Sequence, residues 1–116
     1  MSAGTYNFAA EQGATLERTI TYTDSANAIV NLTGYIGRMQ IRSAVESSSI
    51  ILELTTANSR IVMGGALGTI SIYVDAATMS SIPAGNYVYD LEIVSSGGKV
   101  TRLIEGRFVV KAEVTR

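Results

Sequence analysis

The side chains that most often carry out chemistry in proteins are sparse in this sequence. The 116 residues include no histidine and no cysteine, so the commonest general base, the commonest metal ligand and reactive thiolates are missing. The aspartates and glutamates are dispersed singly, without the alternating acidic spacing of a calcium loop. Two carboxylates could still meet in the fold as a glycosidase pair, but nothing in their order indicates it. We therefore expect no catalytic residue, no metal site and no cofactor, and predict that the protein is not an enzyme.

Two short motifs have a chemical reading and a structural one. The glycine-rich segment "GGALGT", residues 64–69, lacks the Gly-Lys-Ser/Thr ending of a phosphate-binding loop, which favours a hairpin turn. The segment "NLT", residues 31–33, has the form of a glycosylation acceptor, but no secretion signal accompanies it. We interpret both motifs as turns.

Composition and charge limit the class of protein. Hydrophobic residues make up 47% of the chain and charged residues 16%, which is enough apolar surface for one packed core. We expect residues 1–116 to form a single domain. The net charge is −1 and the basic residues are scattered, so we expect no nucleic-acid partner. No apolar run approaches the ~20 residues of a membrane helix, and we expect no membrane association.

The hydrophobic pattern has a period of two along most of the chain. In "TLERTITYTD" the apolar residues Leu16, Ile20 and Tyr22 share one side, with Arg18 interrupting them. Such alternation is typical of half-buried strands. We expect strands at residues 5–9, 14–23, 35–42, 50–54, 60–63, 67–74, 86–95 and 99–111.

Turn residues separate these runs at short spacing, which predicts an all-β sandwich or barrel. The one helical segment that we expect is a short turn near residues 75–82, where Asp75 could serve as the N-cap before Pro83 ends it. We expect residues 1–9 to be an N-terminal arm or edge strand, loose unless something pairs with it.

The segment from Ala84 to Lys111 predicts a hairpin. Gly97 and Gly98 could both supply the positive φ of a two-residue turn. A hairpin closed at this point places Tyr87, Tyr89 and their apolar neighbours on one face, with Tyr89 opposite Gly106, an aromatic–glycine pair that stabilises sheets. The full register would be Tyr87 with Phe108, Tyr89 with Gly106, Asp90 with Glu105 and Leu91 with Ile104. The like charges of Asp90 and Glu105 would be unfavourable unless arginines offset them or Gly106 forms a bulge.

The position of Tyr87 allows two structural roles. In "IPAGNYVY" a glycine stands two residues before a tyrosine at the start of a strand, which is similar to the tyrosine corner of immunoglobulin-like sandwiches. In that motif the hydroxyl bonds to the chain upstream. The alternative is a plain core tyrosine. Both readings make Tyr87 and Tyr89 architectural residues and not ligand-binding ones.

Three aromatic residues are candidates for partner contacts. Tyr6 and Phe8 lie in the arm, which could add as a strand to a neighbour's sheet, and Tyr73 lies on the polar side of its expected strand. On this hypothesis, deletion of residues 2–9 leaves the domain folded and abolishes assembly.

Two segments together resemble small structural proteins of tailed bacteriophages. The first is "VNLTGYIGRMQIR" and the second is "AGNYVYDLEIVSSGGKVTRLIEGRFVVKAEVTR". The matching residues are Leu32 to Tyr35, Arg38, Arg42, Gly85 to Glu92, Gly98 to Leu103, and Gly106. The likeness extends over the chain from about residue 5 and is most specific in the closing third.

The resemblance implies a single immunoglobulin-like β-sandwich of seven to eight mostly antiparallel strands. It also implies a virion building block of the tail, baseplate or fibre attachment, assembled in the host cytoplasm. Its expected partners are other virion proteins, with a homo-oligomer within the particle as a further option. The first alternative is a capsid decoration protein. The second is a carbohydrate-binding module, for which the chain offers no tryptophan and few free tyrosines.

Overall fold

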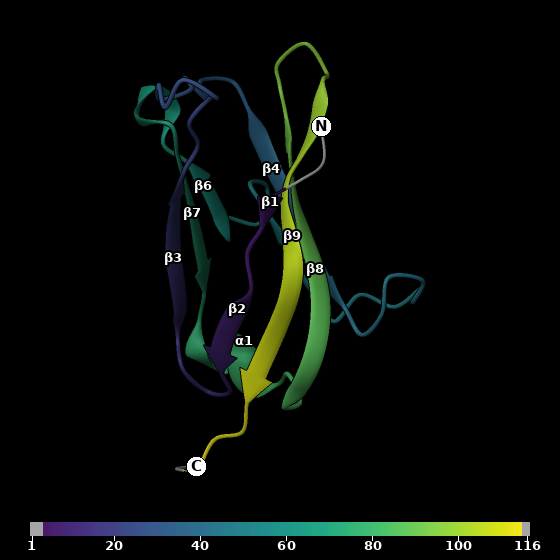
Figure 1. Ribbon diagram of the computed structural model, residues 1–116. Helices are drawn as coiled ribbons and strands as arrows, with labels where there is room; N and C mark the ends of the chain where they lie inside the picture. Colours follow the sequence, from purple (N-terminus) through teal and green to yellow (C-terminus); the bar gives the residue numbers. More distant parts are fainter. Residues whose placement is uncertain (1–3, 115–116) are drawn as a thin grey trace.

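The computed structural model describes residues 4–114, which form two layers of β-strands packed face to face (Figure 1). Nine strands fall within this part of the chain. Their bounds are β1 Gly4–Thr5, β2 Phe8–Glu11, β3 Leu16–Thr21, β4 Ile36–Arg42, β5 Leu52–Thr55, β6 Ile61–Met63, β7 Thr69–Val74, β8 Gly85–Val94 and β9 Val100–Lys111. The expected first strand at 5–9 is divided into β1 and β2, and the other expected strands are confirmed with ends that differ by at most two residues.

The strands form a larger and a smaller sheet. The larger sheet has the order β1-β9-β8-β4-β5, with β2 also paired to β9, and the smaller sheet has the order β3-β7-β6. All pairs are antiparallel except those of β1 and β2 with β9. This is the strand arrangement of an immunoglobulin-like β-sandwich, so the expected fold class is confirmed.

The core lies between the two sheets and is built from the inward positions of each alternating strand. In β8 the buried residues are every second one, from Tyr87 to Ile93, because successive side chains of a strand point to opposite faces. Both sheets supply side chains that are almost fully buried, including Met39, Ile41, Leu54, Ile70, Ile72, Leu91 and Phe108.

Two short helical segments connect the strands. The 3₁₀ helix η1 (Gly65–Leu67) completes the β6–β7 hairpin, and Gly68 follows it with φ 68°, so the "GGALGT" segment is a turn as expected. The helix α1 (Ala76–Ser80) begins after Asp75 and buries Met79. Asp75 occupies the N-cap position as expected, without a capping hydrogen bond from its side chain. Within residues 4–114 neither helix has the length or apolar character to cross a bilayer.

Candidate protein interface

The β8–β9 hairpin has the predicted register at its centre. Tyr87 pairs with Phe108, Tyr89 with Gly106 and Leu91 with Ile104. The unfavourable pair of Asp90 with Glu105 is also present. Arg102, which lies 3.4 Å from the Asp90 carboxylate, offsets part of this repulsion.

The turn that closes this hairpin differs from the prediction. Ser95 accepts a bond from the Gly98 amide and donates one to the Lys99 carbonyl, which makes a three-residue loop of residues 96–98. Of the two glycines only Gly98 has a positive φ, 89°, as the last position of such a loop requires. A bulge beyond Leu91 compensates for the extra loop residue: Glu92 pairs with Arg102, so Leu103 is left over. The bulge is therefore at Leu103 and not at Gly106.

Tyr87 forms a tyrosine corner. Its side chain is 8% exposed, and its hydroxyl donates a hydrogen bond of 2.5 Å to the carbonyl oxygen of Pro83. The bond ties the start of β8 to the connection that follows α1. Of the two roles left open by the sequence, the corner is the one that the structure shows.

Tyr89 holds the N-terminal arm, defined here as residues 4–11. Its hydroxyl donates to the carbonyl oxygen of Tyr6, and burial raises the pKa of this hydroxyl above its ordinary value. The Tyr6 amide donates to the carbonyl of Glu105, and Oδ1 of Asn7 accepts from the Arg107 amide. The arm is therefore paired along β9 of its own domain.

Gly106 allows the arm to approach β9 closely. A Cβ atom at this position would overlap the carbonyl oxygen of Tyr6 and would lie 2.7 Å from Oδ1 of Asn7. The sequence predicted Gly106 as the partner of Tyr89, which the register confirms, but it gave no sign of this second role.

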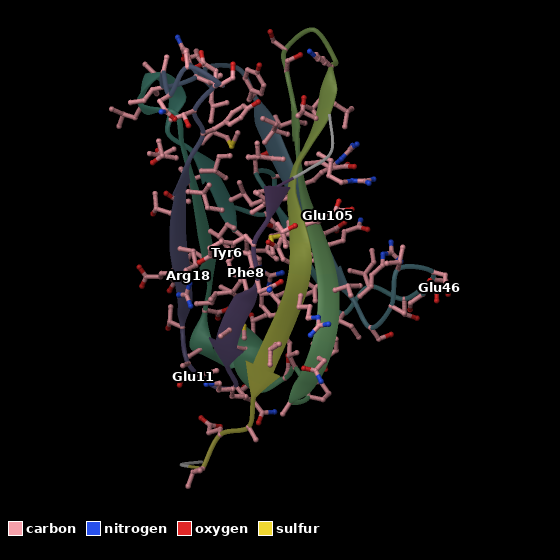
Figure 2. The ribbon with its side chains drawn as sticks, in the orientation of Figure 1. Tyr6, Phe8, Glu11, Arg18, Glu46 and Glu105 are labelled. Carbon is pink, nitrogen blue, oxygen red and sulfur yellow. The ribbon has the colours of Figure 1, made fainter. Side chains whose placement is uncertain are left out.

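Phe8 is a core residue, which corrects its expected role as a partner contact. Its side chain is 1% exposed and packs edge-on against Tyr89, with ring centroids 5.0 Å apart. Figure 2 shows Tyr6 and Phe8 between β3 and β9. Deletion of residues 2–9 would remove a buried aromatic ring, for which truncations cost about 3–5 kcal/mol, so the deleted domain is not expected to remain stably folded. Tyr6 is 44% exposed, and its contact with a partner stays a prediction.

The outer edge of the larger sheet is blocked at β5. The carbonyl of Glu53 accepts hydrogen bonds from Nδ2 of Asn58 and from the Arg60 guanidinium, both 3.0 Å. The amide of Thr55 donates to Oδ1 of Asn58 at 3.0 Å. These side chains occupy the main-chain groups that another strand would need, which is how natural proteins protect sheet edges.

Arg18 blocks the other edge, where the two sheets meet. One guanidinium nitrogen donates to the carbonyl of Glu17 on β3 and the other to the carbonyl of Ala9 on β2, at 2.8 and 3.1 Å. One side chain thus joins the edges of both sheets. The only sequence signal for this role was the charge at Arg18 within an apolar alternation.

The remaining part of β3 is an open edge. Tyr22 donates to the carbonyl of Gly68, continuing the β3–β7 register. Because bonded and non-bonded pairs alternate in an antiparallel ladder, the even residues of β3 bond to β7 and the odd residues point away. The amides and carbonyls of Thr19 and Thr21 therefore face away from β7, where no turn or loop of residues 4–114 bonds to them, and both residues are exposed. We call these main-chain groups the β3 edge.

The fourth edge, at β6, is short. It has three residues, of which Ile61 is 1% exposed. Brevity is itself a form of edge protection, so β6 is a poorer template for another strand than the β3 edge.

The outer face beside the β3 edge is polar with one aromatic ring. Thr19 lies opposite Ser71 and Thr21 opposite Thr69. Tyr73 follows on the same face of β7, opposite Glu17, and is 48% exposed. Its predicted exposure is confirmed, and its contact with a partner stays a prediction.

The outer face of the larger sheet carries a network of charges. Arg38 donates to Glu92 at 2.8 Å, and Arg102 lies near both Asp90 and Glu92. Desolvation, with the nearby Glu92 and Glu105 carboxylates, raises the pKa of Asp90 above its ordinary value of 3.8, and Arg102 partly opposes this. The ion pairs are largely exposed, so they contribute little to stability.

Comparisons with known proteins add two similar shapes. No family model matches the chain, and no curated protein matches its sequence. Extracellular domains of the voltage-gated sodium channel beta4 subunit, described as parallel homodimers that explain a role in cell–cell adhesion, are 12% identical with a TM-score of 0.46, over 98% of this chain and 97% of that one. A structure from work on multimeric cell-adhesive interactions of sodium channel beta subunits is 12% identical with a TM-score of 0.47, over 99% and 98%. The fold assignment rests on the strand order given above.

Proposed function

We propose that this domain is a non-enzymatic structural module that binds other proteins by strand pairing. The observation that carries the proposal is the β3 edge: its main-chain groups at Thr19 and Thr21 are unpaired and exposed, while side chains cover the β5 edge and the seam at Arg18. An unprotected edge is a template for another strand, and strand addition gives affinity through main-chain hydrogen bonds.

We assign the module to the virion of a tailed bacteriophage, in the tail, baseplate or fibre attachment. The support for this location is the resemblance of residues 30–42 and 84–116 to small phage structural proteins. The same resemblance supports a capsid decoration protein as the second candidate. A carbohydrate-binding module is the least supported, because Phe8, Tyr87 and Tyr89 are buried and do not form an exposed aromatic platform.

The test is incorporation into particles by two matched variants. Thr21→Pro removes the edge amide at a position where its N–H faces solvent, and such prolines are tolerated on edge strands. Thr21→Val keeps the amide and the shape of the side chain. We expect Thr21→Val to enter purified particles like the wild type and Thr21→Pro to be excluded. Immunogold labelling of the wild-type particles then separates tail from capsid, and absence of the protein from both would refute the virion assignment.

A further inference from the structure

We propose that the partner of the β3 edge is a second copy of this chain, paired antiparallel across a two-fold axis at Thr21. This inference deepens the proposed function, on which it rests. In this register, residues whose numbers sum to 42 face each other. Thr21 pairs with Thr21 of the second copy, and Thr19 pairs with Thr23.

The main-chain groups of this register are free in the single domain. The ladder alternation makes Thr19 and Thr21 point outward, and Thr23 continues the series. Thr23 lies opposite Ile29 in an antiparallel bridge, but the two residues do not bond to each other. The bridge is held by their neighbours: the Val30 amide donates to the Tyr22 carbonyl, and the Asp24 amide donates to the Ala28 carbonyl. The amides and carbonyls of the three threonines therefore form no hydrogen bond within residues 4–114.

The side chains of this segment are compatible with its own copy. The sequence "TITYT", residues 19–23, places a threonine at every odd position, so the antiparallel pair opposes threonine to threonine on the outer face. Cross-strand threonine pairs stabilise sheets, and like charges would oppose them. In the same register Arg18 lies opposite Asp24 of the second copy, so no like charges are set against each other.

The alternative self-pairing, centred on Thr19, is less favourable. It would place Thr21 opposite Glu17, whose carbonyl already accepts the bond from Arg18 at 2.8 Å. The register centred on Thr21 leaves the Arg18 bridge to Ala9 in place. Two copies then form one continuous six-stranded sheet with the order β6-β7-β3-β3-β7-β6, and each closes the open edge of the other, as an isologous interface requires.

Cysteine cross-linking tests the register directly, because the chain has no cysteine. Paired residues at a bonded position of a ladder have Cα atoms about 5.5 Å apart, which suits a disulfide. We expect Thr21→Cys to oxidise to a covalent dimer at least about tenfold faster than Val62→Cys, because pairing raises the local thiol concentration. Val62 is 57% exposed on the other edge strand of the same sheet and is the matched control.

Light scattering of the purified protein gives the second measurement. We expect the wild type and Thr21→Val to be dimers and Thr21→Pro to be a monomer with an unchanged circular dichroism spectrum. If Thr21→Pro fails to fold, Thr19→Pro takes its place in this measurement. A monomeric wild type, or a dimer in which Thr21→Cys oxidises no faster than Val62→Cys, overturns the proposal.

Particle incorporation distinguishes failure of this inference from failure of the proposed function. Suppose that the wild type is monomeric, and that particles exclude Thr21→Pro but accept Thr21→Val. The β3 edge then takes a strand from a different protein. Equal incorporation of both variants refutes strand pairing as the proposed function.

Discussion

The hydroxyl of Tyr89 donates a hydrogen bond to the carbonyl oxygen of Tyr6, across 83 positions of sequence. Through this bond a residue at the centre of the larger sheet holds the N-terminal arm against β9. The arm then supplies Phe8 to the core, so the ordering of the first strand and the packing of the last hairpin depend on each other.

Tyr89→Phe is expected to destabilise the domain by ~1–2 kcal/mol, because it leaves the carbonyl of Tyr6 without its hydroxyl donor. Urea unfolding measures the loss. Tyr87→Phe is the matched control, since it removes the hydroxyl bond to Pro83 and is expected to cost a similar free energy. Hydrogen exchange separates the two variants: amides of residues 4–11 should exchange faster only in Tyr89→Phe. Equal protection of the arm in both would show that the Tyr89 hydroxyl does not hold it.

Gly106→Ala is expected to destabilise the domain by ~1–3 kcal/mol, the usual range for overpacking. Its methyl group would meet the main chain of Tyr6 and the side chain of Asn7, and neither can move without loosening the arm. Gly4→Ala adds the same methyl group to the arm itself, where the nearest atom is 3.7 Å away. Thermal unfolding should show a clear loss only for Gly106→Ala; equal melting temperatures would exclude the close approach.

The two glycines of the β8–β9 loop are expected to differ. Gly98→Ala should lower the free energy of unfolding by about 1–2 kcal/mol, because a residue with a Cβ atom must adopt the left-handed conformation there. No atom lies within 4 Å of the added methyl group, so no steric clash adds to this cost. Gly97→Ala should be close to neutral. Chemical denaturation of both variants distinguishes the three-residue loop from a two-residue turn at Gly97 and Gly98, in which both substitutions would be costly.

Asp90→Asn is expected to stabilise the protein at pH 7. The pKa of Asp90 is raised by desolvation and by nearby carboxylates, so the charged form is disfavoured in the folded state. As the pH falls from neutral towards the ordinary value of 3.8, the folded state takes up this proton before the unfolded state does, and the group's unfavourable contribution disappears. The stability advantage of Asp90→Asn over the wild type should therefore shrink as the pH falls.

Glu46→Gln is the control for this pH dependence. Glu46 lies on the loop that projects from the body of the domain (Figure 2) and its replacement removes one negative charge from an exposed position. Melting temperatures of the three proteins between pH 7 and pH 4 provide the comparison. A stability difference between Asp90→Asn and the wild type that stays constant with pH would contradict the raised pKa.

The sequence by itself determined the local structure and the central register of the closing hairpin. The alternation in β8 and β9 allows only one pairing that keeps Tyr87, Tyr89 and Leu91 in the core, since a slip of one residue would turn them to solvent. The same periodicity identified the other strands, and the glycine before Tyr87 made the tyrosine corner one of the two roles predicted for that residue. These features depend on neighbours in the chain or on one short-range pair of strands.

The tertiary structure alone decided which surfaces are covered and which are open. The sequence predicts Phe8 as a contact residue because a short apolar strand has the same pattern whether it pairs with its own domain or with another. The roles of Arg18, Asn58 and Arg60 as edge caps depend on which strands end up at the edges, and no local pattern encodes that. The open β3 edge follows from the same cause: Thr19 and Thr21 read as an ordinary half-buried strand until the sheet order leaves one side of β3 without a neighbour.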